Sequence, residues 1–124
     1  MIEGVGVDII EVGRLEKAIT KNDRFVSRVF TPAEVEYCGT GKVRFERFAA
    51  RFAVKEAVSK ALGITWGDAV PWTDAEVEIA ESGKPSVRLV GKAAERMEAL
   101  GVTVVHVSIS HSGGVAVALA VAEK

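Results

Sequence analysis

Residues 51–61 read Arg51-Phe52-Ala53-Val54-Lys55-Glu56-Ala57-Val58-Ser59-Lys60-Ala61. Alanine, lysine, glutamate and arginine favour helix, and neither glycine nor proline interrupts the run, so we predict a helix here. Glu56 and Lys60 lie one turn apart on one face, as do Arg51 and Lys55. A single carboxylate among cations fits a site that binds a metal ion together with a phosphorylated ligand. The alternative is an amphipathic surface helix without such a role, which is what most helices of this composition are.

The composition limits the class of protein. With 124 residues, 48% of them hydrophobic and 27% charged, the chain has the make-up of one soluble globular domain spanning residues 1–124. No apolar run reaches the roughly 18 residues of a membrane span, and the N-terminus does not resemble a secretory signal. The formal net charge of −1 argues against a globally basic nucleic-acid binder. The single cysteine, Cys38, excludes an internal disulfide framework, fits a cytoplasmic protein and is expected to be buried.

Two predicted strands have faces of contrasting character. Residues 4–10 place Val5, Val7 and Ile9 on one face and Gly4, Gly6 and Asp8 on the other. The two glycines leave the second face open to close approach by a ligand or by another backbone. Residues 115–121 alternate larger apolar side chains with Ala116, Ala118 and Ala120. This alanine face suits a helix packed close against the sheet.

The other segments complete an α+β pattern without an internal repeat. We predict a long helix over residues 43–62 that ends at Gly63, and a short helix that begins at Thr31-Pro32. A loop over 64–73, a hairpin about residues 82–85, a helix over 92–100, a strand over 102–109 and a turn over 110–114 precede the last strand. These elements predict an α+β fold with a mostly antiparallel sheet packed against the long central helix.

A series of cations follows the first strand. Within residues 11–29 they recur at steps of three and four, at Arg14, Lys17, Lys21, Arg24 and Arg28. A continuous helix would place them on one stripe, whereas Asn22-Asp23 could divide the helix into two pieces. Such a stripe is commonly only a solvated face. The functional alternative is a docking surface for an acidic partner.

The two isolated carboxylates Asp8 and Glu56 suit a Mg²⁺ site on a phosphorylated substrate. Mg²⁺ prefers oxygen ligands and keeps several waters, so one or two carboxylates plus substrate phosphates complete its coordination. A closed structural zinc site is not indicated, because Cys38 has no His or Cys partner nearby in the sequence. The segment over 39–42 lacks the spacing of a Walker motif. A serine hydrolase is not indicated, because the sequence has no Gly-x-Ser-x-Gly nucleophile elbow and His111 directly follows Ser110.

Four motifs resemble, in order and spacing, those of the holo-acyl-carrier-protein synthases, the small bacterial 4′-phosphopantetheinyl transferases. They are Gly6-Val7-Asp8-Ile9, the run over residues 51–61, Gly83-Lys84-Pro85 and Ser108-Ile109-Ser110-His111. The aspartate motif alone is weak, whereas the set is specific and spans nearly the whole chain. The resemblance implies the family's fold and its reaction in fatty acid biosynthesis. In that reaction the phosphopantetheine arm of coenzyme A moves to a serine of apo acyl carrier protein, and 3′,5′-ADP leaves.

The resemblance also implies roles for individual residues. Asp8 and Glu56 match the family's Mg²⁺ ligands, and Lys60 matches a residue near the reacting phosphates, so these three form the expected catalytic set. Either Glu56 or a metal-bound water would take the serine proton. The expected contacts to coenzyme A come from Arg51, Lys55, Lys60, Lys84, Ser110 and His111. For His111 we expect a hydrogen bond to the ligand, or packing in the turn, rather than a role as catalytic base.

The same resemblance implies partners. In the family the first helix docks the acidic carrier protein. Arg14 is the best match, and the further candidates are Lys17, Lys21, Arg24, Phe25 and Arg28. Relatives of this length are homotrimers with sites at subunit interfaces, and neither nucleic acid nor a membrane is an expected partner. Two rival functions are a non-catalytic coenzyme A-binding module, which would not need both carboxylates, and a docking protein, which would not need Lys84 or Ser108–His111.

Overall fold

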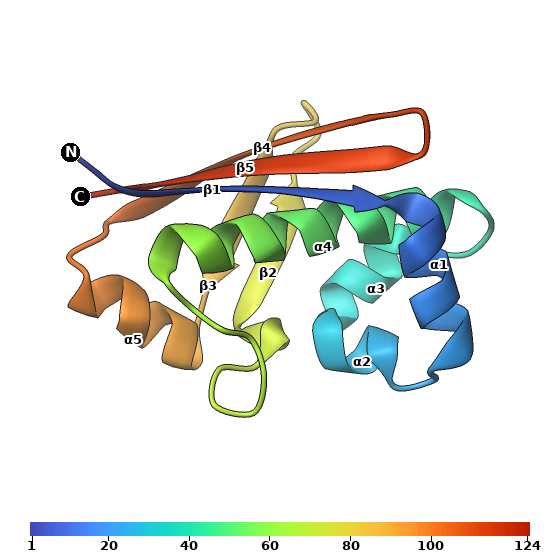
Figure 1. Ribbon diagram of the computed structural model, residues 1–124, viewed down its shortest axis with the longest axis horizontal. Helices are drawn as coiled ribbons and strands as arrows, with labels where there is room; N and C mark the ends of the chain where they lie inside the picture. Colours follow the sequence, from blue (N-terminus) through green and yellow to red (C-terminus); the bar gives the residue numbers. More distant parts are fainter.

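The structure, a computed structural model, describes all residues 1–124. Figure 1 shows a sheet lying along the long helix α4, with a separate hairpin that passes behind the helix in this view and reaches β4. Strands β1, β5 and β4 form the sheet in that order, all antiparallel, and β2 pairs only with β3. The elements in chain order are β1 (Ile2–Glu11), α1 (Val12–Lys21), α2 (Phe25–Val29), α3 (Pro32–Cys38), α4 (Val43–Leu62), a 3₁₀ turn η1 (Trp72–Asp74), β2 (Ala75–Ile79), β3 (Pro85–Leu89), α5 (Gly91–Ala99), β4 (Val104–Ser112) and β5 (Val115–Glu123).

The α+β fold and the long central helix are confirmed. Helix α4 has the predicted bounds, and Gly63 ends it in the left-handed conformation with φ 66°. The start of α3 is also as predicted, because Thr31 and Glu34 cap each other's backbone amides. None of the helices combines the length and the apolar character needed to cross a membrane.

Backbone contacts fix the sheet on α4. A Cβ atom at Gly4 would overlap the Ala61 carbonyl oxygen, and one at Gly6 would overlap the Ala57 carbonyl oxygen. On β5 the inward side chains are alanines with no exposed surface, at positions 116, 118, 120 and 122. The glycine face of β1 is therefore open to another backbone, one of the two alternatives that the sequence suggested. We call this contact between β1 and α4 the glycine seam.

The opposite face of the sheet carries the larger apolar side chains and is bare. Val5 and Val7 are each 55% exposed and Ile9 is 67% exposed, and Leu119 of β5 also lies on this side. Monomeric proteins rarely expose a contiguous apolar patch of this kind.

The first helical segment is divided at Asn22-Asp23, one of the two alternatives that the sequence left open. Helix α1 ends at Lys21, and the Asn22 side chain accepts a hydrogen bond from the Arg24 amide at 3.0 Å. The predicted turn over residues 110–114 is too long. Gly113 and Gly114, with φ 58° and 77°, close a two-residue hairpin, so residues 110–112 belong to β4.

Candidate active site

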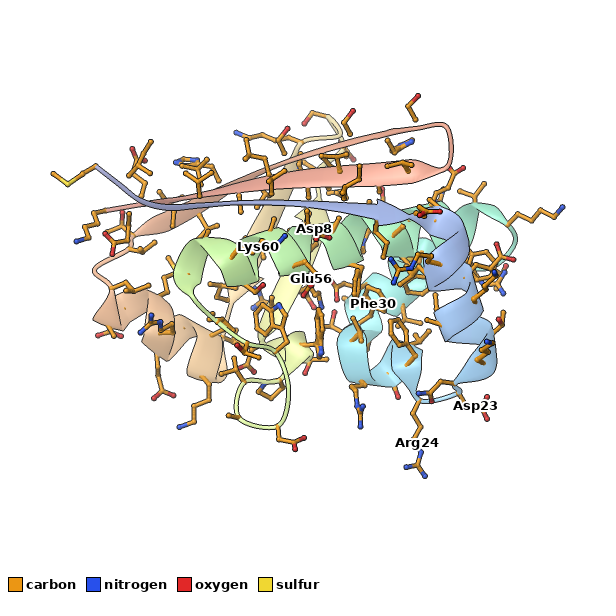
Figure 2. The ribbon with its side chains drawn as sticks, viewed as in Figure 1. Asp8, Asp23, Arg24, Phe30, Glu56 and Lys60 are labelled. Atoms are coloured by element: carbon orange, nitrogen blue, oxygen red, sulfur yellow. The ribbon has the colours of Figure 1, made fainter.

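A hollow beside the glycine seam collects the two predicted metal ligands. We call it the carboxylate hollow; its lining residues are Asp8, Ile9, Ile10, Arg14, Leu15, Ala18, Phe25, Phe52 and Glu56. Asp8 reaches it from the later half of β1, and Glu56 reaches it from the middle of α4, where the strand lies along the helix (Figure 2). The seam brings these carboxylates together although 48 positions separate them in the sequence.

Lys60 lies next to the carboxylates. Its Nζ donates a hydrogen bond to the Val7 carbonyl oxygen at 2.8 Å and lies 3.4 Å from Asp8 Oδ1. Burial raises the pKa of the Glu56 carboxyl, the charge of Asp8 raises it further, and Lys60 offsets part of the shift. The three residues predicted as the catalytic set are thus brought together, and the two carboxylates lack full charge compensation.

The oxygen donors of this hollow fit a hard cation such as Mg²⁺. No group of three or more His, Cys, Asp or Glu side chains gathers anywhere in the structure as a complete protein-built metal site would require. Two facing carboxylates are the donor set that Mg²⁺ uses when waters and substrate phosphates supply its other ligands. The raised pKa of Glu56 also fits a cation site. Repulsion from Asp8 causes part of that rise in pKa, and a bound cation would relieve this repulsion.

A second hollow lies on the other flank of α4. We call it the arginine hollow; its lining residues are Tyr37, Val43, Glu46, Arg47, Ala50, Arg51, Ile79, Gly83, Pro85, Ile109 and His111. It brings together Arg51 and His111, both predicted ligand contacts. Lys84 stands between Gly83 and Pro85 at the rim of this hollow.

Arg51 is buried without an acidic partner. Only 3% of the residue is exposed, and it takes part in no ion pair. One guanidinium nitrogen donates to the Arg47 carbonyl oxygen at 3.1 Å, while Nε has no hydrogen-bond partner. A buried cation is costly unless it is paired, and such a group is a mark of a functional site. The hollow is therefore suited to an anion.

The two hollows are separate within a single chain. They share no lining residue. Arg51 and Glu56 are five positions apart, so their side chains leave α4 about 140° apart around its axis. The predicted metal ligands and the predicted nucleotide contacts therefore face different sides of the molecule.

The prediction that Lys55 contacts coenzyme A is wrong. Its side chain has no exposed surface, and Nζ lies 2.7 Å from both Glu34 Oε1 and the Val29 carbonyl oxygen and 3.3 Å from the Trp72 carbonyl oxygen. Burial lowers the pKa of its ammonium group, and the Glu34 carboxylate offsets part of that effect. All three donors are occupied, so Lys55 is an internal cation of the core.

The remaining predicted residues are dispersed. Ser110 lies on the outer face of β4 and is exposed, because the pleat turns it away from His111 and out of both hollows. Among the docking candidates, Arg14 and Phe25 line the carboxylate hollow, and Arg28 lies beside Trp66 and Trp72. Because the helix breaks after Lys21, the five cations do not form one straight stripe.

Among the residues of the arginine hollow that sequence reasoning missed are Arg47 and Tyr37. Arg47 stands one turn before Arg51, a spacing that could have revealed it. Tyr37 comes from α3, and nothing in its local sequence marks it. Its ring reaches the hollow only because α3 packs on α4.

Known proteins share this fold and sequence. A family model described as the 4′-phosphopantetheinyl transferase superfamily matches residues 4–120, and the chain belongs to that superfamily. Within it, the chain is similar to proteins named holo-[acyl-carrier-protein] synthase. It is 44% identical over 124 residues to that of Syntrophus aciditrophicus, covering 99% of this chain and 97% of the relative. It is 46% identical over 127 residues to that of Anaeromyxobacter dehalogenans, with the same coverage.

Solved structures agree with these sequence relatives. The holo-[acyl-carrier-protein] synthase of Neisseria meningitidis superposes with a TM-score of 0.88 at 32% identity, over 100% of both chains. That of Bacillus anthracis, in complex with CoA (3′,5′-ADP), superposes with a TM-score of 0.81 at 39% identity, over 100% of this chain and 98% of the other. The resemblance identified from the motifs is confirmed, and the chain is an enzyme of the phosphopantetheinyl transferase type.

Proposed function

We propose that this protein is a holo-[acyl-carrier-protein] synthase, and that the whole chain, residues 1–124, acts as one transferase domain. It moves 4′-phosphopantetheine from coenzyme A to a serine of apo acyl carrier protein and releases 3′,5′-ADP. The observation that carries the proposal is the carboxylate hollow, where Asp8, Glu56 and Lys60 meet beside the glycine seam. A binding module would have no need for two carboxylates in this position.

In the proposed reaction the serine Oγ attacks the β-phosphorus of coenzyme A. A new P–O bond forms to the serine, the pyrophosphate P–O bond breaks, and the electron pair leaves with 3′,5′-ADP. Lys60 stabilises the phosphate charge through its ammonium group. The serine proton goes to Glu56 or to water, and the raised pKa of Glu56 makes this carboxylate a better base than an ordinary glutamate.

Mg²⁺ is the proposed cofactor, held by the carboxylates of Asp8 and Glu56. When bound, the ion would neutralise phosphate charge and orient the pyrophosphate. The support is the donor chemistry of the hollow, namely two facing carboxylates with incomplete charge compensation.

The arginine hollow is the proposed site for the nucleotide end of coenzyme A, with Arg51, His111 and Lys84 as contacts. Because the two hollows face different sides of α4, a complete site needs the arginine hollow of a second copy. The bare apolar face of the sheet offers a surface for such an assembly, and we propose a homotrimer with shared sites. Ser110, exposed on that outer face, would then contact ligand at the junction between copies.

The carrier protein is proposed to dock beside the carboxylate hollow. Arg14 and Phe25 line the hollow itself, so a partner seated there would deliver its serine to the reacting phosphate. The other cations of the segment that follows β1, namely Lys17, Lys21, Arg24 and Arg28, favour an acidic partner. A role in fatty acid biosynthesis in the cytoplasm follows from that substrate and completes the proposal.

The test is intact-mass spectrometry of apo acyl carrier protein incubated with coenzyme A, Mg²⁺ and this protein. We expect the carrier to gain one phosphopantetheine mass, with 3′,5′-ADP appearing in equal amount. An unchanged carrier mass would refute the transferase proposal, and omission of Mg²⁺ provides the metal control.

The docking surface is tested separately by the charge reversal Arg14→Glu. We expect the KM for the carrier protein to rise about tenfold or more while the KM for coenzyme A stays constant. Lys92→Glu on α5 is the matched control, because the Lys92 side chain is 66% exposed and lies outside both hollows. Equal changes in both KM values would show that Arg14 does not serve the carrier protein.

A further inference from the structure

The arginine hollow contains an aromatic contact that the proposed reaction has not used. Tyr37 is the last residue but one of α3, and its ring centroid lies 4.3 Å from the central guanidinium carbon of Arg51. The same centroid lies 5.8 Å from the guanidinium carbon of Arg47. Tyr37 itself is 51% exposed, so its ring covers the arginine without being part of the core.

A ring holds a guanidinium group in a way that a carboxylate cannot. A carboxylate partner would consume two N–H donors and cancel the positive charge. A ring face attracts the cation through its quadrupole, leaves the in-plane N–H donors free and leaves the net charge intact. Arg51 shows this state. Only 3% of the residue is exposed, the Tyr37 ring lies over its guanidinium group, and its Nε has no hydrogen-bond partner.

The main chain provides the rest of the support. The Arg51 guanidinium donates to the Arg47 carbonyl oxygen at 3.1 Å, and Arg47 in turn donates to the Cys38 carbonyl oxygen at the end of α3 at 3.4 Å. These contacts link both arginines to the C-terminal end of α3, where the main-chain carbonyl groups attract cations. The Tyr37 ring covers the face of the Arg51 guanidinium group.

We propose that Tyr37 is a positioning residue that holds Arg51, charged and with free donors, ready for a phosphate group of the nucleotide. The inference rests on the proposed function, because it takes the arginine hollow as the nucleotide site. Tyr37 acts through Arg51 and needs no contact with substrate.

The experiment measures binding of 3′,5′-ADP to the intact protein by calorimetry, for Tyr37→Leu and Tyr37→Phe. The Phe variant keeps the ring, and we expect it to bind as the wild type does. The Leu variant loses the ring, and we expect its Kd to rise about 2- to 30-fold. In steady-state assays the Leu variant should raise the KM for coenzyme A and leave kcat unchanged.

A second background separates positioning from general packing. When Arg51→Ala is already present, Tyr37→Leu should weaken 3′,5′-ADP binding no further, because the group that Tyr37 holds is gone. If Tyr37→Leu lowers the Tm strongly, Tyr37→Met fills the same space without a ring and replaces it in each comparison.

The outcomes are distinct. An unchanged Kd in the Leu variant, equal losses in the Leu and Phe variants, or an undiminished effect in the Arg51→Ala background would each overturn the positioning role. If the wild type itself fails to bind 3′,5′-ADP, the proposed nucleotide site is refuted, and the role of Tyr37 is refuted with it.

Discussion

Glu56 is held in a position that stabilises its neutral form. Burial and the nearby charge of Asp8 both raise the pKa of its carboxyl, and Lys60 compensates only in part. The proposed reaction needs the ionised form, which binds the metal or accepts the proton. In the proposed role, Glu56 would therefore lower folding stability for the sake of the reaction, as active-site groups commonly do.

Glu56→Gln should separate these two effects. We expect turnover to be lost, while the Tm in the absence of Mg²⁺ and coenzyme A rises above that of the wild type. Because the folded pKa is raised, position 56 is neutral in both proteins below the ordinary glutamate pKa of 4.5, which applies to the unfolded chain. The difference then grows as the pH rises through the folded pKa and Glu56 must ionise.

Thermal unfolding from pH 4 to 8 provides the measurement. Glu95→Gln on α5 is the control, because the Glu95 side chain is 68% exposed. Full activity in Glu56→Gln, or a Tm gain that is largest at acid pH, would contradict this account of Glu56.

Lys55 and Glu34 form an internal pair that ties α4 to α3 and β2. Glu34 accepts hydrogen bonds from Lys55 Nζ at 2.7 Å and from the amides of Thr31 and Val77, both at 2.8 Å. Lys55→Met would leave the carboxylate buried and uncompensated. We expect it to lower the free energy of unfolding by about 3–5 kcal/mol.

Urea unfolding measures this loss, and Glu34→Gln combined with Lys55→Met should recover part of it, since no charge then remains. The KM for coenzyme A of the folded fraction should match the wild type. A tenfold rise in that KM at normal stability would return Lys55 to the ligand site.

At the scale of elements, the glycine seam sets how closely β1 lies on α4. Gly6→Ala would drive a methyl group into the Ala57 carbonyl oxygen, so strand and helix must separate. We expect a loss near the upper end of the roughly 1–3 kcal/mol that overpacking costs. Turnover should fall further than stability, because Asp8 and Glu56 move apart.

Gly13→Ala is the matched control. No atom lies within 4 Å of the added methyl group at Gly13, which belongs to α1, so this variant should gain up to about 1 kcal/mol. Chemical denaturation and the mass-spectrometric assay read out both variants. Equal stabilities for the two alanine variants would mean that the seam tolerates a side chain.

The elements also show what the sequence could and could not predict. The bounds of α4 and the alanine face of β5 were predictable. Helix propensity and the two-residue alternation of side chains along a strand both depend only on the local sequence. Lys55 was misassigned because it stands in the same motif as Glu56, and adjacency in a helix does not place two side chains on one face. Tyr37 was missed because its contact with Arg51 is made by helix packing and has no local pattern.

At the scale of the whole molecule, the bare face of the sheet is the feature that most needs a partner. Val7 lies on this face midway along the edge strand β1 and is 55% exposed, so Val7→Lys should leave the fold of one copy intact. We expect the wild type to be a trimer and the variant to dissociate and lose turnover, because a buried unpaired charge is costly in an interface.

Light scattering coupled to size-exclusion chromatography reads the assembly state directly. Val90→Lys, at a site 42% exposed between β3 and α5, is the control and should remain assembled and active. A monomeric wild type with full turnover would refute the shared site.

The placement of the two hollows on opposite flanks of α4 has a genetic consequence. Copies that carry Glu56→Gln and copies that carry Arg51→Ala should each be inactive alone, yet each retains the hollow that the other has lost. Random mixing into cyclic trimers would pair two intact hollows at about a quarter of the junctions. The two inactive variants expressed together should therefore restore part of the activity. A site confined to one chain could not show this complementation.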